Sequence, residues 1–74
     1  MGEIIKVEWL DSGGLDEVWT FKDDWELHPH RIVSVGILVT DDKDKLVICQ
    51  SENDDQYGRL FAIPKGCITS RRKL

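Results

Sequence analysis

The segment from Ile32 to Thr40 reads Ile-Val-Ser-Val-Gly-Ile-Leu-Val-Thr and predicts the strongest strand of the chain. Apolar residues with many β-branched side chains favour extended backbone. One side of this strand carries four of them: Val33, Val35, Ile37 and Val39. The other side carries Ile32 and Leu38, so both faces are apolar and both need cover. Gly36 inside the strand predicts a bend or a close backbone crossing, as small barrels require.

Four further short strands are predicted, over Ile4–Leu10, Lys45–Ser51, Arg59–Ile63 and Cys67–Lys73. Polar residues at 41–44 join two of the strands in a hairpin. Residues 52–58 are expected to form a polar loop. Pro64-Lys65-Gly66 predicts a single 3₁₀ turn before the last strand.

Residues 15–31 form an irregular excursion between the first two strands. Val18–Phe21 could be a short strand, and Asp23 is a plausible N-cap with Glu26 three positions later. Pro29 would end such a helical turn, because the residue before proline is disfavoured in the α region. We expect at most one turn of helix here.

Five short strands with almost no helix predict an all-β domain over residues 1–74, a small five-stranded SH3-like or Sm-like barrel. An OB-fold is the alternative, although it usually includes a helix between strands three and four. The shared period-two phase predicts the following inward-facing set: Ile5, Val7, Trp9, Val33, Val35, Ile37, Val47, Cys49, Leu60, Ala62 and Ile68.

Composition narrows the class of protein. The 74 residues are 41 % hydrophobic and 32 % charged, which is typical of a globular domain. No apolar run approaches the roughly 20 residues of a membrane span. A net charge of −4 disfavours a general nucleic-acid coat. The two cysteines, Cys49 and Cys67, are expected to be reduced and to pack as small apolar side chains.

No residue pattern predicts an enzyme, a cofactor or a metal site. Phe61–Gly66 resembles the segment that leads into the Nudix box, but the sixth residue after Gly66 is Arg72, where that chemistry needs a glutamate. His28 and His30 have no second ligand pair with zinc-like spacing. The aspartates at 41, 42 and 44 are interpreted as a solvated hairpin tip, and those at 54 and 55 as solvated loop residues.

The aromatic residues are the best candidates for a binding site. Trp19 and Trp25 lie in the excursion, and Tyr57 lies in the polar loop; in SH3-like barrels two such loops often border one groove. The shortness of the strands nevertheless favours the interpretation in which Trp19 or Trp25 plugs an end of the barrel and supplies core. The candidate ligand-binding residues are Trp19, Trp25, His30, Tyr57, Arg59 and Lys65.

Three segments, Val7–Ser12, Ser34–Val39 and Ile63–Ile68, followed by Arg71–Leu74, resemble a group of small uncharacterised bacteriophage and prophage proteins. The resemblance extends from about Lys6 to Leu74. It implies phage origin and action in a bacterial cytoplasm, and it brings no known activity and no catalytic residues. The segment Arg59–Ile68 is also similar to the strand–turn–strand that closes Sm-like barrels, with Cys67 in place of the usual asparagine.

Two functions of different class follow from these patterns. The first is a non-enzymatic binding or adaptor module that acts on a host or phage protein through its aromatic loops and acidic surface. The alternative is an Sm-like oligomer that binds RNA or a small nucleotide through Lys65, Arg59 and a neighbouring aromatic side chain. The second apolar face of residues 32–40 also predicts a homo-oligomer, either a dimer or a small ring.

Overall fold

The structure is a computed structural model that describes residues 2–14 and 18–74. It contains seven β-strands and one 3₁₀ helix in these residues: β1 (Ile4–Asp11), β2 (His30–Asp41), β3 (Lys45–Cys49), β4 (Ser51–Glu52), β5 (Tyr57–Gly58), β6 (Phe61–Pro64), η1 (Lys65–Cys67) and β7 (Ile68–Lys73). Within them, no helix has the length and the apolar character needed to cross a membrane. The all-β prediction is confirmed.

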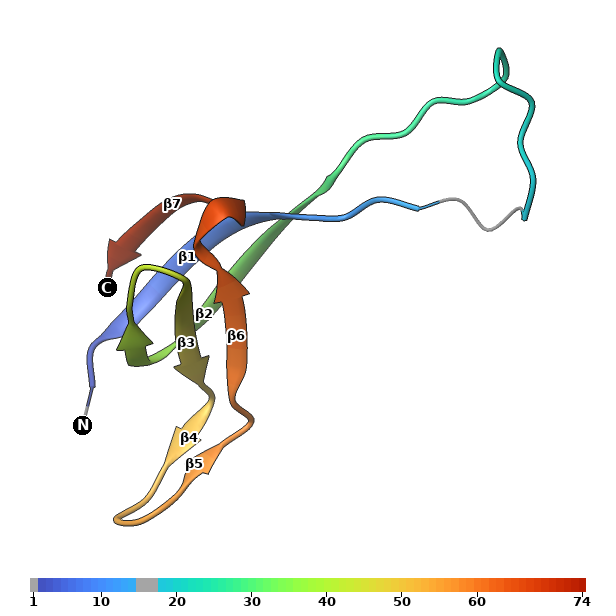
Figure 1. Cartoon of the computed structure of the whole chain (residues 1–74). Helices are drawn as coiled ribbons and strands as arrows, with labels where there is room; N and C mark the ends of the chain where they lie inside the picture. Colours follow the sequence, from blue (N-terminus) through green and yellow to red (C-terminus); the bar gives the residue numbers. More distant parts are fainter. Residues whose placement is uncertain (1, 15–17) are drawn as a thin grey trace.

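Five strands form one antiparallel sheet in the order β6-β3-β2-β1-β7 (Figure 1). The strands and the 3₁₀ turn lie close to their predicted positions, although Cys67 belongs to η1 and not to the last strand. The loop predicted at 52–58 forms most of the hairpin β4–β5, which begins at Ser51, the residue predicted to end the preceding strand, and extends beyond β3 and β6.

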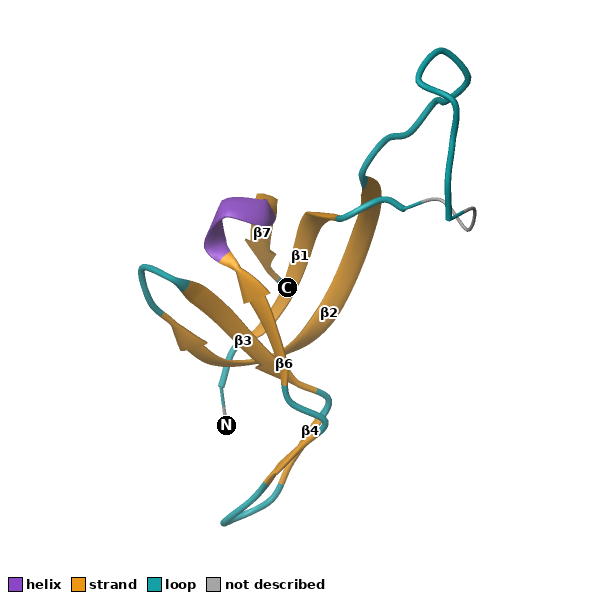
Figure 2. Ribbon diagram, turned by 45° about the vertical axis from the view of Figure 1, so that its right-hand side comes forward, coloured by secondary structure: helices purple, strands orange, loops and turns teal. Residues whose placement is uncertain are grey.

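The sheet is strongly curled but is not closed into a barrel (Figure 2). β6 and β7 lie at its two edges and, in the described part of the chain, do not pair with each other. η1 joins them directly, so the chain crosses from one edge to the other in three residues. The five predicted strands are therefore present in one sheet, but the pairing of β6 with β7 that would close a barrel is missing from the described residues.

The core lies on the concave side of the sheet and consists of six apolar side chains that are at most 9 % exposed: Ile5, Val7, Trp9, Leu46, Ile48 and Ile63. Ile32, Leu38 and Ile68 pack against it. Cys49 is also fully buried, but it pairs with Ile37 and therefore lies on the other side of the sheet. The predicted inward set was thus right for β1 and, in part, for Ile68; Cys49 is buried as predicted, but outside this cluster. It was wrong for Val33 and Val35 of β2, which are 53 % and 45 % exposed, and for Leu60, which precedes β6 and is 56 % exposed.

Pairing with β1 decides which side of β2 faces the core. Trp9 lies opposite Ile32, and Ile5 lies opposite Gly36, so the even-numbered residues of β2 point inward. Ser34 can occupy this side because its hydroxyl accepts a 3.1 Å hydrogen bond from the indole Nε1 of Trp9. Ile37 and Val47 are half-buried, while Leu46, Ile48 and Ile63 take the inward positions predicted for Val47, Leu60 and Ala62.

The excursion between β1 and β2 projects away from the sheet as an arm, which we define as residues 18–28 (Figures 1 and 2). It gives the molecule dimensions of 53 × 22 × 20 Å. The irregular excursion is present as predicted, and it contains neither the short strand that 18–21 would allow nor a helical turn after Asp23. Trp19 is 91 % exposed and Trp25 is 61 % exposed, so neither tryptophan plugs the sheet.

Candidate functional site

The base of the arm is set by the ends of β1 and β2. Asp11 pairs with His30, and the Asp11 carboxylate accepts a 2.9 Å hydrogen bond from the Ser12 amide. A β-carbon at Gly13 would lie 2.5 Å from the carbonyl oxygen of His28. Only glycine therefore allows the outgoing and returning segments to run this close together.

The far end of the arm is a turn in which the Asp24 amide donates a 3.0 Å hydrogen bond to the Phe21 carbonyl. Val18, Trp19 and Phe21 precede or begin this turn and are 91 %, 91 % and 85 % exposed. Trp19, Thr20 and Phe21 line a shallow surface hollow. The arm thus presents large apolar side chains that the rest of the described chain leaves uncovered.

Acidic residues accompany these apolar side chains. The arm carries Asp23, Asp24 and Glu26 against the single cation Lys22, so its net charge is −2 with His28 neutral. Glu26 lies 3.5 Å from the ring of His28, and both side chains are exposed. Aromatic surface combined with negative charge is suited to a partner that offers apolar pockets beside lysine or arginine.

The structure brings only some of the six predicted ligand-binding residues together. Trp19 and Trp25 share the arm, and His30 lies at its base as the first residue of β2. Tyr57 lies in β5, which projects from a different end of the sheet (Figures 1 and 2). The expected groove between the arm and the polar loop therefore does not form.

Arg59 lies apart from the arm. Its φ is 56°, and no other described non-glycine residue has a positive φ. It contributes to a hollow together with five further residues: Ser34, Ile48, Gln50, Leu60 and Phe61. The Phe61 ring packs against Trp9, with ring centroids 5.6 Å apart. This hollow is open and small, and Arg59 is the one cationic side chain among the residues that line it.

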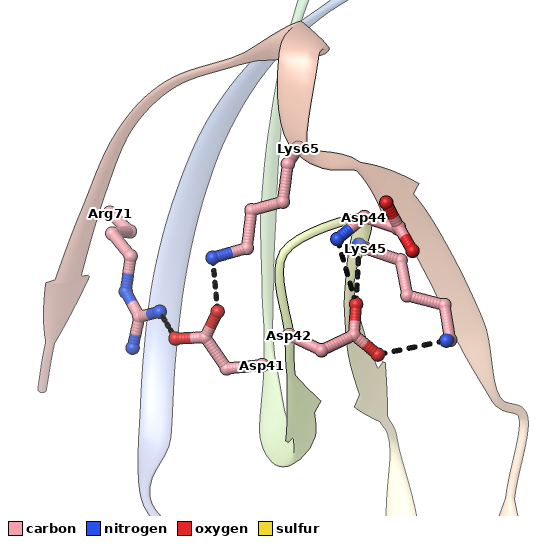
Figure 3. A network of polar contacts seen from close by, with 6 residues as sticks. All are labelled: Asp41, Asp42, Asp44, Lys45, Lys65 and Arg71. Atoms are coloured by element: carbon pink, nitrogen blue, oxygen red, sulfur yellow. Dashed lines mark hydrogen bonds and ion pairs between the residues drawn. The ribbon is translucent and has the colours of Figure 1, made fainter.

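Lys65 lies in η1, and its ammonium group forms an ion pair with the carboxylate of Asp41 (Figure 3). Arg71 of β7 binds the other oxygen of the same carboxylate. Asp41 thus connects the end of β2 to η1 and β7, and it is not the solvated tip residue that the sequence suggested. The two cations lie together, as a phosphate site would require, but Asp41 occupies the position between them.

Asp42 also has a structural role in the β2–β3 turn. Its Oδ1 accepts 2.9 Å hydrogen bonds from the amides of Asp44 and Lys45, and its Oδ2 lies 2.9 Å from the Lys45 ammonium (Figure 3). The hydrogen bonds from the Lys45 side chain and amide, followed by that from the Asp44 amide, lower the pKa of Asp42 from 3.8 to about 2. At neutral pH the charged carboxylate therefore holds the turn.

A pH dependence of stability follows from this pKa. Because the folded-state pKa of Asp42 is lowered, its contribution to stability is present above pH 3.8 and is lost as the pH falls through about 2.

We expect Asp42→Asn to flatten the loss of stability over this range, since asparagine keeps the Oδ1 acceptor but does not titrate. Lys45→Met should move the loss to higher pH, because it removes the largest cause of the lowered pKa. Urea unfolding followed by tryptophan fluorescence at a series of pH values measures both effects, and identical slopes in the three proteins would contradict the assignment.

Glu8 of β1 is the second carboxylate with a perturbed pKa. The nearby charge of Arg31, 3.2 Å away, and a hydrogen bond from Ser70 lower the pKa of Glu8. These contacts lie on the side of the sheet opposite the core, since Val7 and Trp9 on either side of Glu8 point inward.

Sequence reasoning missed Val18 and Phe21 as candidate surface residues, because Val18–Phe21 also fits a strand. The spacing of the apolar residues does not separate the two interpretations, because 18, 21 and 25 fit a helical period while 19, 21, 25 and 27 fit period two. In the described residues, no three histidine, cysteine, aspartate or glutamate side chains are arranged to hold a metal ion. Cys49 is buried, Cys67 is half-buried, and both are free thiols.

Comparison with family models, with curated proteins and with solved structures yields no match to this chain.

Proposed function

We propose that this protein is a non-enzymatic binding module that docks against another protein through its arm. The observation that carries the proposal is the exposure of Val18, Trp19 and Phe21, each at 85 % or more. Exposed apolar clusters are uncommon on small monomers and mark interaction sites. Tryptophan and other aromatic anchors dominate the binding energy of protein interfaces, which fits the composition of the arm.

The charge of the arm indicates the chemistry of the partner. With Asp23, Asp24 and Glu26 beside the aromatic side chains, the best matching surface has apolar pockets bordered by lysine or arginine. Attraction between opposite charges speeds association and weakens as salt screens it. The apolar contacts are much less sensitive to salt, so we expect binding to become slower at high salt without being abolished.

The origin and finer fold class belong to the same proposal. The resemblance to phage and prophage proteins supports a phage-derived module that acts in the bacterial cytoplasm on a host or phage protein. The strand order β6-β3-β2-β1-β7, the long excursion after β1 and the 3₁₀ turn before β7 are features of an SH3-like barrel. We infer an SH3-like domain with separated edges, in which the Asp41 ion pairs connect β2 with η1 and β7.

The contacts of Lys65 and Arg59 count against the alternative of an RNA-binding or nucleotide-binding oligomer. A phosphate at Lys65 would have to displace Asp41, which also neutralises Arg71. Arg59 lines a different hollow, with Leu60 and Phe61. An oligomer of this kind would also crosslink to nucleic acid, which the experiment below can detect.

Site-specific photo-crosslinking tests the proposal. A benzophenone amino acid replaces Phe21 on the arm in one variant and Tyr57 on β5 in a matched control, since both side chains are exposed aromatics. After irradiation in bacterial host lysate, we expect protein adducts from position 21 whose crosslinked peptides are rich in lysine and arginine. Few or none of these adducts should appear from position 57.

A second variant tests whether the arm provides the affinity. Trp19→Ser combined with Trp25→Ser should reduce the yield of the adducts at position 21 by tenfold or more, with unchanged far-ultraviolet circular dichroism. Adducts to nucleic acid, or equal protein adducts from positions 21 and 57, would contradict docking through the arm.

A further inference from the structure

The convex side of the sheet is a second surface that the described residues leave uncovered. We call it the outer face, and it is formed by nine residues: Ile4, Lys6, Glu8, Leu10, Arg31, Val33, Val35, Ser70 and Arg72. The register defines it, because Lys6 pairs with Val35 and with Arg72, while Glu8 pairs with Val33 and with Ser70. The neighbours of Lys6 and Glu8 along β1 point into the core, so these cross-strand rows lie on the opposite side.

The outer face is apolar at its centre and positively charged around it. Val33 and Val35 are 53 % and 45 % exposed, which is high for β-branched residues in the middle strand of a sheet. Arg31 is paired with Glu8, but neither Lys6 nor Arg72 forms an ion pair within residues 2–14 and 18–74. Three cations against one carboxylate give the face a net charge of +2.

The arm and the outer face are complementary in apolar surface and in charge. The arm carries aromatic side chains and a net charge of −2, and the face carries valines and a net charge of +2. Opposite charge around an apolar centre is the arrangement of a specific protein interface.

The arm of the same chain points away from its own outer face. Its base is held by the Asp11–His30 pair and by the close approach of Gly13 to His28, and the segment leaves the sheet beyond this end (Figures 1 and 2). To cover its own sheet, the arm would have to reverse direction at a base that is already held. A second copy can offer its face without any such change.

We propose that two copies of the chain form a two-fold dimer in which the arm of each copy lies on the outer face of the other. The inference rests on the proposed docking role of the arm and names a second copy of this chain as its partner. A two-fold exchange covers both apolar surfaces of both copies and closes the assembly.

The area available is sufficient for a stable dimer. Aromatic side chains bury about 150–250 Å² each, so Trp19, Phe21 and Trp25 of one arm supply roughly 450 Å² at the lower limit. Two arms and the surfaces beneath them then approach ~1,800 Å² in total, within the usual range of about 1,200–2,000 Å² for specific interfaces. Such burial also adds to the small core of each chain.

Sedimentation equilibrium of the purified chain tests the dimer. We expect a mass of twice 8.5 kDa at micromolar concentration for the wild type, and the single-chain mass of 8.5 kDa for Trp19→Ser combined with Phe21→Ser. Tyr57→Ser, a matched loss of an exposed aromatic outside both surfaces, should leave the dimer intact. A single-chain mass for the wild type overturns the inference, and so does a ladder of larger species, which would indicate open-ended association.

Charge reversal tests whether the arm meets the outer face. Lys6→Glu combined with Arg72→Glu should give monomers, and adding Asp23→Lys and Asp24→Lys to the same chain should restore the dimer. Failure of this rescue, with all variants folded by circular dichroism, would contradict arm-on-face packing. Arg72, Asp23 and Asp24 are exposed and Lys6 is half-buried, and none of the four belongs to the core cluster, so these changes remove no core contact.

Crosslinking of the purified protein distinguishes this inference from the proposed function. A benzophenone at position 21 should crosslink to peptides containing Val33 or Val35, and mixing isotope-labelled with unlabelled chains should give mixed adducts. Adducts within one chain only would overturn the exchange. A monomer whose arm still crosslinks to another protein in lysate would overturn the dimer alone, whereas an arm that crosslinks to no protein would overturn both.

Discussion

Leu46→Ala is expected to destabilise the protein by about 2–5 kcal/mol, because it removes a fully buried side chain and leaves a cavity. Leu46 is 0 % exposed and belongs to the core with Ile48 and Ile63. A 74-residue domain has a typical free energy of unfolding of ~4–11 kcal/mol, so this one change can consume much of it. Urea or thermal unfolding followed by circular dichroism measures the loss.

Leu60→Ala is the matched control, since the same atoms are removed from a side chain that is 56 % exposed. We expect a loss below about 1 kcal/mol at this position. Because the period-two phase of the sequence predicts Leu60 as inward, the pair of variants separates the two assignments of the core. Equal losses at the two positions would contradict the observed burial.

Gly36→Ala is expected to destabilise the protein by about 1–3 kcal/mol through overpacking. A β-carbon at Gly36 would lie 2.9 Å from the Cys49 carbonyl oxygen and 3.0 Å from the Ile48 β-carbon. The oxygen is a backbone atom of β3, so relief of the clash requires β2 and β3 to separate. The expected readout is a lower denaturation midpoint, with faster hydrogen exchange in β2 and β3.

Gly66→Ala is the control for this effect. A β-carbon at Gly66 would meet no atom within 4 Å, and its φ is not in the left-handed region. We expect no loss, and a gain of up to about 1 kcal/mol from the lower entropy of the unfolded chain. A loss at Gly66 as large as that at Gly36 would show that close approach of β2 and β3 is not the cause.

The positions of the strands were determined by local sequence. Alternation over Ile4–Leu10, the apolar residues of 32–40 and the polar reversal at 41–44 each specify extended backbone or a turn without reference to the rest of the chain. Pro64 and Gly66 likewise specify the tight turn that the structure shows as η1. The backbone conformation of these elements is therefore determined by a few neighbouring residues in the sequence.

The inward side of β2 was decided by tertiary structure. Both faces of this strand are apolar, so its own pattern leaves two equivalent choices, and a one-residue change of register exchanges them. The pairing of Ile5 with Gly36 and of Trp9 with Ile32, together with the hydrogen bond from Trp9 to Ser34, selects the even-numbered side. Val33 and Val35 are therefore left on the outer face.

In the candidate site, too, the local sequence determined one part and the tertiary structure another. The sequence by itself identified Trp19 and Trp25 as unusual residues in an irregular segment, but burial depends on distant parts of the chain. Only the folded sheet shows that the core is complete without these side chains, and that they stand 91 % and 61 % exposed on the arm. Similarly, Asp41 looked like a solvated turn residue until the curl of the sheet brought Lys65 and Arg71 to its carboxylate. Local pattern determines backbone conformation over a few residues, whereas the side that is covered and the charges that meet depend on contacts between residues far apart in the sequence.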